Sequence, residues 1–293
     1  MLLLDGNALS KTIKAEIKIE VDTIREKGQR VPHLVAVMVG ENPASAAYVR
    51  NKIKSCEQVG FRSTMIHRDT TATQDDILAV VAALNADPDV DGFIVQLPLP
   101  KHINEQAINL AIDPRKDVDG FHPTNFGRMV QGLPAYLPAT PYGILLMLER
   151  YGIATAGKHC VVVGRSNIVG TPVGILLSRK GNPGDCTVTI AHSRTTDLPS
   201  ITRQADILIA AIGIPNFVTA DMVKPNAVVI DVGINRIEDA TAKNGTRLVG
   251  DVDFEAIAPT CSAITPVPGG VGPMTVTCLM LNTLRACRRE IYG

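Results

Sequence analysis

The sequence predicts two α/β domains, each built on a parallel sheet, because short apolar strands alternate with amphipathic helices along most of the chain. A second observation is a β-branched strand at residues 160–163 that runs through Gly164 into a helical pattern from Gly170. The third is length, since 293 residues are enough for two hydrophobic cores.

The composition is that of an ordinary globular protein, with 45% hydrophobic and 20% charged residues. A formal net charge of zero offers no basic excess for nucleic acid or an anionic membrane. The N-terminal segment lacks the features of a signal peptide, and no apolar run reaches membrane-spanning length. Six scattered cysteines without a C-x-x-C pair predict reduced thiols and no metal site. We therefore expect a cytoplasmic protein with no nucleic-acid or membrane partner.

The first half has the pattern of an α/β unit without a glycine-rich phosphate turn. Apolar residues at helical spacing predict a helix over residues 7–27, and Gly28 marks its end. The other predicted elements are strands at 33–39, 61–67 and 92–99 and helices at 43–60 and 73–85. Residues 113–141 are rich in Pro, Gly and Asp, and we expect loops and short segments there, at the junction between the domains.

The second half predicts a Rossmann-type dinucleotide-binding domain. In the turn between Gly164 and Gly170, backbone N–H groups and a helix N-terminus would lie beside a bound pyrophosphate. Ser166 stands near the place of the usual second glycine, so an ordinary strand-to-helix turn remains an alternative. A helix over residues 141–151 leads into this domain. Further strands are predicted at 187–191, 207–211 and 227–232, and a surface loop at 237–246.

Ligands bind at the carboxyl ends of the strands in such sheets, so Gly213 and residues 231–235 should line the cofactor crevice. A C-terminal helix from residue 274 is expected to return to the first domain, because the dinucleotide core is complete without it. The predicted division is residues 1–140 plus 272–293 for a catalytic domain and residues 141–271 for the dinucleotide domain.

The residues after strand 187–191 predict NADP as the cofactor. An NAD site normally has a carboxylate here that accepts hydrogen bonds from the ribose 2′-hydroxyl. This chain instead has Ser193 and Arg194, and Arg165 lies in the preceding phosphate turn. Arg165 alone would be an ordinary solvated turn residue. A hydroxyl with two cations, however, suits a 2′-phosphate.

Tyr48 and Lys52 are the first candidate catalytic residues. They lie four apart on the helix predicted after Pro43 and therefore share one face. A neighbouring cation stabilises phenolate, and burial lowers the pKa of a lysine, so the pair could act as acid and base. The alternative is an exposed lysine packed along a tyrosine.

Three further segments could line a site. Gln96 is an amide at the end of an apolar strand, where it is either a site residue or a satisfied core glutamine. Asp117 and Asp119 lie in a turn-rich segment and could be turn formers only. Gly269 and Gly270 lie in a loop of glycines between prolines, which either allows close approach of a flat ligand or is merely a stiff turn.

Six motifs, in the same order and over essentially the whole chain, closely resemble the bifunctional methylenetetrahydrofolate dehydrogenase/methenyltetrahydrofolate cyclohydrolase family. They are Val39-Gly-Glu-Asn-Pro-Ala-Ser45-x-x-Tyr48-x-x-x-Lys52, Gln96-Leu-Pro-Leu-Pro100, Lys116-Asp-Val-Asp-Gly120, Gly164-Arg-Ser-x-Ile-Val-Gly170, Asp231-Val-Gly-Ile-Asn235 and Pro266-Val-Pro-Gly-Gly-Val-Gly-Pro273.

The resemblance implies NADP-dependent oxidation of 5,10-methylenetetrahydrofolate to the methenyl compound, followed by hydrolysis to 10-formyltetrahydrofolate, in a homodimer. Lys52 would be the main catalytic residue of the hydrolysis, together with Tyr48, Gln96 and Asp119. The expected folate contacts are Tyr48, Lys52, Gln96, Leu97, Asp119, Pro268, Gly269 and Gly270. The expected NADP contacts are Gly164, Arg165, Ser166, Ile168, Ser193, Arg194, Gly213, Ile234 and Thr275.

Two other functions remain alternatives. A shikimate-type NADP dehydrogenase has the same order of domains, but the Pro-rich context of Gln96 and the Gly-Gly-Val-Gly loop argue against it. A non-catalytic nucleotide-sensing module would be favoured by the loss of Lys52 or Asp119, and both residues are present.

Overall fold

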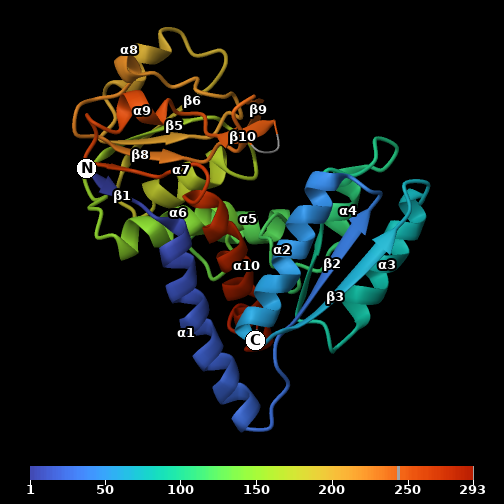
Figure 1. The fold of residues 1–293 in the computed structure, drawn as a ribbon. Helices are drawn as coiled ribbons and strands as arrows, with labels where there is room; N and C mark the ends of the chain where they lie inside the picture. Colours follow the sequence, from blue (N-terminus) through green and yellow to red (C-terminus); the bar gives the residue numbers. More distant parts are fainter. Residues whose placement is uncertain (243–244, 293) are drawn as a thin grey trace. The chain divides into compact units, whose positions relative to one another are not determined.

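The computed structural model describes residues 1–242 and 245–292 and divides into two compact units (Figure 1). The six-stranded unit comprises Met1–Ser10 and Thr140–Thr275, and the three-stranded unit comprises Lys11–Ala139 and Val276–Gly293. Helices α1 (Gly6–Glu26) and α10 (Val271–Cys287) each continue from one unit into the other. The predicted fold, two α/β domains with a C-terminal helix that returns to the first, is confirmed.

The three-stranded unit contains a parallel sheet of order β3-β2-β4. Its strands are β2 (His33–Val39), β3 (Arg62–Arg68) and β4 (Gly92–Val95). Helix α2 (Pro43–Val59) covers one face of the sheet, and α3 (Gln74–Ala86) and α4 (Glu105–Ala111) cover the other (Figure 1). All seven residues of the central strand β2 are buried, which explains its unbroken apolar run. The helix α5 (Pro123–Val130) follows in the chain.

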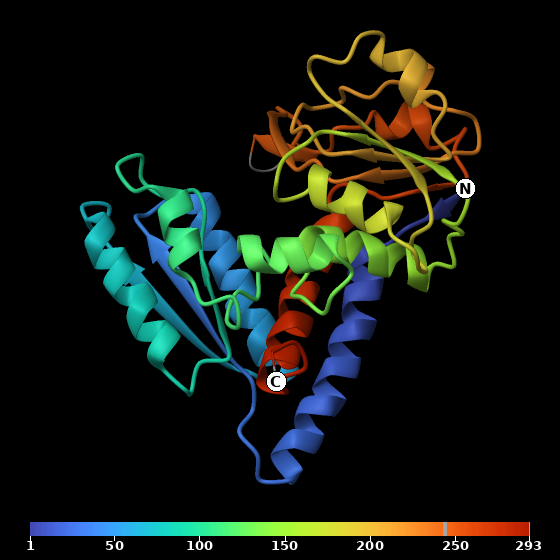
Figure 2. The ribbon, with the colours of Figure 1, turned by 180° about the vertical axis from the view of Figure 1, so that it is seen from behind.

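The six-stranded unit contains a parallel sheet of order β1-β11-β8-β7-β5-β6. The strands are β1 (Leu2–Leu3), β5 (His159–Val163), β6 (Thr187–Ala191), β7 (Ile207–Ala210), β8 (Val228–Asp231) and β11 (Ala263–Ile264). Helices α6 (Ala139–Arg150) and α7 (Gly170–Ser178) lie on one face, and α8 (Leu198–Thr202) and α9 (Phe254–Ile257) lie on the other (Figures 1 and 2). A short 3-10 helix, η1 (Ala220–Met222), lies between β7 and β8 in sequence.

Most element ends lie within three residues of the sequence prediction, and two boundaries differ by more. Strand β4 ends at Val95 rather than at residue 99, because Pro98 and Pro100 have no N–H to donate to a neighbouring strand. The first ten residues belong to the six-stranded unit rather than to the first domain, because β1 pairs in parallel with β11. The short elements α4, α8 and α9 do not follow from the sequence pattern, since four to seven residues carry little periodic signal.

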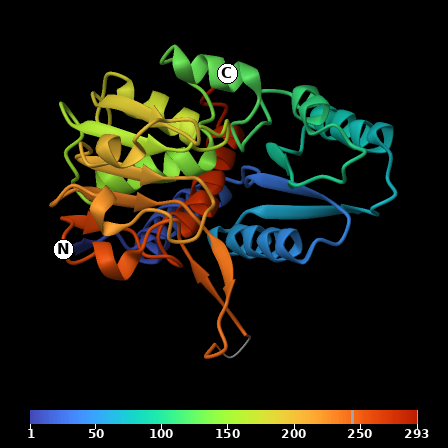
Figure 3. The same cartoon turned by 90° about the horizontal axis from the view of Figure 1, so that it is seen from above.

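The segment 237–246, predicted as a loop, contributes to a β-hairpin instead. Strand β9 (Asn235–Glu238) pairs antiparallel with β10 (Thr246–Val249), and the hairpin projects from the six-stranded sheet (Figure 3). Residues 243 and 244, within the same segment, lie outside the described residues. In the described part of the chain, none of the helices is both long enough and apolar enough to cross a membrane.

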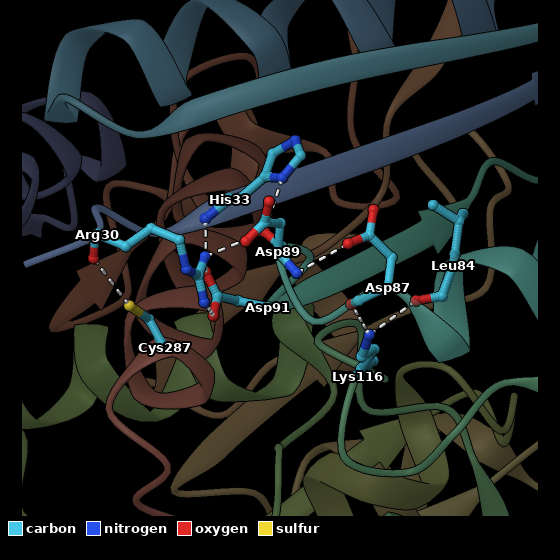
Figure 4. A network of polar contacts seen from close by, with 8 residues as sticks. All are labelled: Arg30, His33, Leu84, Asp87, Asp89, Asp91, Lys116 and Cys287. Atoms are coloured by element: carbon cyan, nitrogen blue, oxygen red, sulfur yellow. Dashed lines mark hydrogen bonds and ion pairs between the residues drawn. The ribbon is translucent and has the colours of Figure 1, made fainter.

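Ionic and polar contacts join the loops that precede β2 and β4 (Figure 4). The Arg30 guanidinium donates two hydrogen bonds to the Asp91 carboxylate, at 2.8 and 2.7 Å. Asp91 also accepts a hydrogen bond from the backbone N–H of His33 at 2.7 Å. Nearby, Lys116 Nζ donates to the carbonyl of Leu84 at 2.8 Å, at the end of α3. These contacts fix the amino ends of the strands.

Candidate active site

The first candidate site lies where the chain leaves β4 in the three-stranded unit. Helix α2 places Tyr48 and Lys52 one turn apart, and the backbone N–H of Gln96 donates to the carbonyl of Val37 at 2.8 Å. Lys52 Nζ donates to Gln96 Oε1 at 3.2 Å. The Gln96 amide is itself oriented, because its Nε2 donates to the carbonyl of Leu97 at 2.8 Å. The structure therefore brings four of the predicted site residues together.

Lys52 is a buried lysine with a lowered pKa. The residue is 6% exposed. Burial lowers the pKa of its ammonium, and the negative charge of Asp119 opposes that effect. The Nζ atom lies 5.4 Å from the centre of the Tyr48 ring. Burial also raises the pKa of the Tyr48 hydroxyl, to which Asp119 adds. The exposed-lysine alternative is therefore wrong, and the buried amine is better suited to accept a proton than an exposed lysine.

The segment that carries Asp119 is held by a second, buried carboxylate. Burial raises the pKa of Asp119, and the charge of Lys52 opposes that effect. Asp117 is 2% exposed and accepts hydrogen bonds from the His122 N–H at 2.8 Å and from Asn125 Nδ2 at 2.9 Å. Burial raises the pKa of Asp117 to about 7 despite these donors. Asp117 is thus an anchor for this turn, in agreement with the turn-forming alternative that the sequence left open.

The second candidate site lies at the carboxyl ends of the parallel strands in the six-stranded sheet. The register pairs Val163 of β5 with Ala191 of β6 and with Ala210 of β7, and pairs Ala210 with Asp231 of β8. The loops that follow these strands therefore start side by side at the carboxyl ends of the strands, where parallel sheets bind ligands. These loops carry the predicted cofactor contacts Gly164, Ser193, Gly213 and Ile234.

The turn between β5 and α7 admits no side chain at its two glycines. Gly164 has a φ of 124°, and a Cβ there would lie 2.2 Å from the carbonyl oxygen of Ala211. A Cβ on Gly170 would lie 2.2 Å from the carbonyl oxygen of Gly164. Ser166 Oγ accepts a hydrogen bond from the Val169 N–H at 3.2 Å. A glycine at position 166 could not make this bond, which explains the departure from the usual glycine. A glycine turn before a nine-residue helix fits a dinucleotide pyrophosphate.

The residues after β6 fit the 2′-phosphate of NADP. Residues 192–195 contain no carboxylate, and Arg165, Ser193 and Arg194 are exposed. The backbone N–H of Arg194 donates to His192 Nδ1 at 3.1 Å, and the backbone N–H of His192 donates to Thr195 Oγ1 at 2.8 Å. The turn is therefore fixed by its own contacts, while the side chains of the serine and both arginines stay accessible to an anion.

The remaining predicted cofactor contacts are Ile168 in the turn before α7, Ile234 in the loop after β8, and Thr275 in α10. Ile168 and Ile234 are 47% and 53% exposed. A Cβ built on Gly272 would lie 3.3 Å from Ile234 Cδ1, so this side chain packs beside the start of α10. The hydroxyl oxygens of Thr275 and Thr140 lie 2.9 Å apart. Direct contact of these residues with a cofactor stays a prediction.

Three predicted folate contacts, Pro268, Gly269 and Gly270, lie in the six-stranded unit, in the loop between β11 and α10. Gly269 has a φ of 104°, and its carbonyl accepts a hydrogen bond from the backbone N–H of Asn7 at 3.1 Å. A Cβ on Gly270 would lie 2.5 Å from the carbonyl oxygen of Pro266. The loop therefore requires both glycines. The remaining predicted folate contacts belong to the three-stranded unit.

Two buried carboxylates of the six-stranded unit received no individual role from the sequence. Asp231 is 3% exposed and Asp251 is 0% exposed. Each lies in an apolar run, Val-Val-Ile-Asp231 and Leu-Val-Gly-Asp251-Val. A carboxylate in such a run needs buried hydrogen-bond donors, and that is the signal by which sequence reasoning could have found both residues.

The chain matches two family models that together span most of its length. Residues 4–119 match the model described as tetrahydrofolate dehydrogenase/cyclohydrolase, catalytic domain. Residues 138–291 match the model described as tetrahydrofolate dehydrogenase/cyclohydrolase, NAD(P)-binding domain. Among curated relatives, the Bifunctional protein FolD of Cytophaga hutchinsonii is 62% identical over 286 residues, which are 98% of this chain and 99% of that protein.

Solved structures give the same result. The bifunctional FolD methylenetetrahydrofolate dehydrogenase/cyclohydrolase of Campylobacter jejuni has a TM-score of 0.93 and 45% identity, with 99% of each chain covered. The Trypanosoma brucei FolD enzyme, complexed with NADP cofactor and inhibitor, has a TM-score of 0.93 and 37% identity, covering 100% of this chain and 99% of that one. Sequence and structure agree over the full length, and the chain belongs to the tetrahydrofolate dehydrogenase/cyclohydrolase family.

Proposed function

We propose that this protein is a bifunctional enzyme that oxidises 5,10-methylenetetrahydrofolate with NADP and hydrolyses the resulting methenyl compound to 10-formyltetrahydrofolate. The observation that carries the proposal is the buried Lys52 beside Gln96, in a chain whose family performs both reactions. The full-length family match favours this function over the shikimate-type dehydrogenase and over a non-catalytic sensor.

In the hydrolysis, Lys52 acts as the base. Its lowered pKa leaves a larger share of free amine at neutral pH than an exposed lysine has, and that amine accepts a proton from the water that attacks the methenyl carbon. Gln96 holds the amine through its Oε1 atom, so the lone pair has a defined position. The water oxygen forms a bond to the methenyl carbon. The bond between that carbon and N5 then breaks, and the remaining hydroxyl proton passes to N5 as the formyl carbonyl forms, which gives the 10-formyl product.

In substrate binding, Tyr48 and Asp119 serve different parts of the folate. The Tyr48 ring lies along the side of Lys52 and offers a flat surface for the folate ring system. Asp119 accepts hydrogen bonds from the pterin amino edge. Burial raises the pKa of Asp119 because it disfavours the ionised carboxylate. Hydrogen bonds from the pterin stabilise the ionised form and so offset the cost of burial. Leu97 follows Gln96 in the chain, and its carbonyl accepts the hydrogen bond from Gln96 Nε2.

On the oxidation side, the chain positions the reactants and supplies no nucleophile. NADP, when bound, supplies the hydride acceptor. The glycine turn from Gly164 to Gly170 holds the pyrophosphate, and Arg165, Ser193 and Arg194 hold the 2′-phosphate. The backbone of Gly269 and Gly270, which carry no side chain, approaches the folate closely next to Pro268. The work of these residues is orientation and exclusion of water.

The proposal is tested by absorbance of the methenyl compound. The purified protein is mixed with 5,10-methylenetetrahydrofolate and either NADP or NAD, and hydrolysis of added methenyltetrahydrofolate is compared with its background rate. NADP-dependent methenyl formation with accelerated hydrolysis is expected. Oxidation without hydrolysis would contradict the cyclohydrolase assignment, and activity on shikimate alone would favour the alternative dehydrogenase.

The cofactor assignment has its own test in Arg165→Ala. Loss of one charge-assisted contact to the 2′-phosphate should weaken NADP binding by roughly 1.5 to 3 kcal/mol. NAD lacks this phosphate, so NAD binding should stay the same in the variant. Equal affinity of the variant and the parent for NADP, measured by titration calorimetry, would remove Arg165 from the phosphate site.

We also propose that the enzyme is a cytoplasmic homodimer. The six cysteines are free thiols, in agreement with a reducing compartment. Strand β6 forms one edge of the six-stranded sheet, and its residue Ile190 is 37% exposed, which supports an interface along this edge. Light scattering after size-exclusion chromatography should give twice the mass of the 31.3 kDa chain. A monomer at micromolar concentration would contradict this assembly.

A further inference from the structure

Asp231 and Asp251 are buried carboxylates of the six-stranded unit that neither proposed reaction uses. Asp231 ends β8, and Asp251 comes shortly after β10. The backbone N–H of Asp251 donates to Asp231 Oδ1 at 2.9 Å, so the two residues are directly joined. A buried carboxylate is unfavourable unless hydrogen bonds compensate it, so the donors show which segments this pair holds.

Asp251 joins the loop after β7 to the segment after β8. Its Oδ2 atom accepts hydrogen bonds from the backbone N–H groups of Ile212 and Gly213, at 2.7 and 2.9 Å. Its Oδ1 atom accepts a hydrogen bond from Asn235 Nδ2 at 2.9 Å. Gly213 and Ile234, which precedes Asn235, are both predicted cofactor contacts. One carboxylate therefore sets the positions of two loops of the proposed cofactor site.

Asp231 joins the same segments to the glycine loop that precedes α10. Its carboxylate accepts hydrogen bonds from the backbone N–H groups of Gly233 at 2.9 Å and Val252 at 3.0 Å. Its own backbone N–H donates to Thr265 Oγ1 at 2.7 Å. Thr265 is 0% exposed and lies immediately before the loop at residues 266–270. The two carboxylates are thus bonded to the loops after β7 and β8, and the backbone of Asp231 is bonded to Thr265 at the start of the third loop.

Glycines make room for both carboxylates. A Cβ on Gly250 would lie 1.7 Å from Asp231 Oδ2. A Cβ on Gly233 would lie 2.3 Å from Asp251 Oδ1. The backbone therefore approaches each carboxylate more closely than any other residue type allows. Such close packing leaves the two carboxylates little freedom, as expected of groups that fix the positions of loops.

We propose that Asp231 and Asp251 are positioning residues for NADP binding, whose carboxylates hold the loops after β7 and β8 in their binding arrangement. The inference rests on the proposed use of NADP. Without the Asp251 carboxylate, the N–H groups of Ile212 and Gly213 lose the acceptor that they share, and the loop after β7 gains alternative arrangements. Binding then has to select one of them, which lowers the apparent affinity.

The test compares Asp251→Ala with Asp251→Asn by calorimetric titration of NADP into the purified full-length protein. We expect Asp251→Ala to weaken NADP binding by roughly tenfold or more, because the loop after β7 loses two hydrogen bonds to one acceptor. Asp251→Asn should bind within roughly threefold of the parent, because its Oδ1 can still accept both N–H bonds while Asn235 turns its amide to accept from the new Nδ2. This rescue distinguishes an acceptor role from a role of the charge.

Two controls separate positioning from general destabilisation. Asp206 accepts a backbone N–H bond from His159 at 2.9 Å just before β7, at the opposite ends of the strands, so Asp206→Ala should leave NADP binding unchanged. Hydrolysis of methenyltetrahydrofolate depends on Lys52 in the other unit, and it should stay within roughly twofold of the parent in Asp251→Ala.

The inference is overturned if Asp251→Ala binds NADP as the parent does, or if Asp206→Ala weakens binding equally. Should Asp251→Ala fail to fold, Asn235→Ala removes a single bond of the same carboxylate and should weaken NADP binding several-fold; unchanged affinity there also overturns it. Failure of the parent protein to bind NADP would instead contradict the proposed function, so the two failures are distinguishable.

Discussion

The two ends of the three-stranded sheet treat a buried charge differently. At the amino ends of β2 and β4, the Arg30 guanidinium donates two hydrogen bonds to the Asp91 carboxylate. Past the carboxyl end of β4, the Lys52 ammonium donates to the neutral amide of Gln96. Both ends belong to the same small sheet, and both place a charged group out of water. The first end compensates its charge with an opposite charge, and the second leaves it partly uncompensated.

The difference appears in the pKa values. Asp91 raises the pKa of Arg30 through its hydrogen bonds, so this cation is more firmly charged than usual. Burial lowers the pKa of Lys52, and Asp119 offsets only part of that effect. A firmly charged pair suits a structural joint, and a readily neutralised amine suits proton transfer. The contrast separates structural from catalytic charges within one sheet.

The largest effect is expected from Lys52→Met. Loss of the amine should reduce cyclohydrolase activity by about 10² to 10⁴, the usual contribution of a positioned base, while dehydrogenase activity stays measurable. Lys14 provides a matched control, because it is a partly buried lysine that donates to Ser55 Oγ at 2.9 Å. Lys14→Met should keep both activities. Equal hydrolysis by Lys52→Met and the parent would end the assignment of Lys52 as base.

Gln96→Glu should give Lys52 a carboxylate partner, as Arg30 has in Asp91. The new carboxylate would stand where Gln96 Oε1 now accepts from Lys52 Nζ at 3.2 Å. An opposite charge at this distance raises a lysine pKa, by roughly one to three units. Less free amine is then present at a given pH, so the pH at which hydrolysis reaches half its maximum should rise. A pH–rate profile without an upward shift would show that Lys52 is not the titrating group.

Arg30→Ala tests the structural end. The variant leaves the Asp91 carboxylate without its cation, and unfolding free energy should fall by roughly 1 to 2 kcal/mol, since Arg30 is partly exposed. Urea unfolding followed by circular dichroism measures this loss. Both activities per folded molecule should stay the same. A stable variant with poor hydrolysis would instead mean that the two ends of the sheet do not have separate roles.

The smallest effect is expected from Lys18→Ala. Lys18 and Asp22 form an ion pair four residues apart on α1, and their side chains are 50% and 37% exposed. Exposed helical pairs of this kind add little, because water screens both charges. The unfolding midpoint and both activities should not change measurably. A clear loss of stability would show that exposed charges matter more here than the comparison implies.

Local sequence patterns located much of the fold. Strands β2 and β6 have the predicted bounds, since runs of apolar, β-branched residues specify a strand directly. They also located the glycine turn, where Gly164 and Gly170 leave no space for a side chain. The end of β4 at Val95 also has a local cause, since Pro98 and Pro100 cannot donate to a neighbouring strand. What local patterns could not give is the pairing of β1 with β11, because it depends on partners distant in sequence.

The sequence by itself determined the alternation of strands and helices, the turn before α7, and the pairing of Tyr48 with Lys52 on one helical face, because each is carried by residues within one or two turns of each other. Only the tertiary structure decided that Lys52 is buried and bonded to Gln96, 44 positions away. It likewise decided that Asp251 accepts hydrogen bonds from Ile212 and Gly213. A pKa and a loop position depend on neighbours in space, and packing brings those neighbours together.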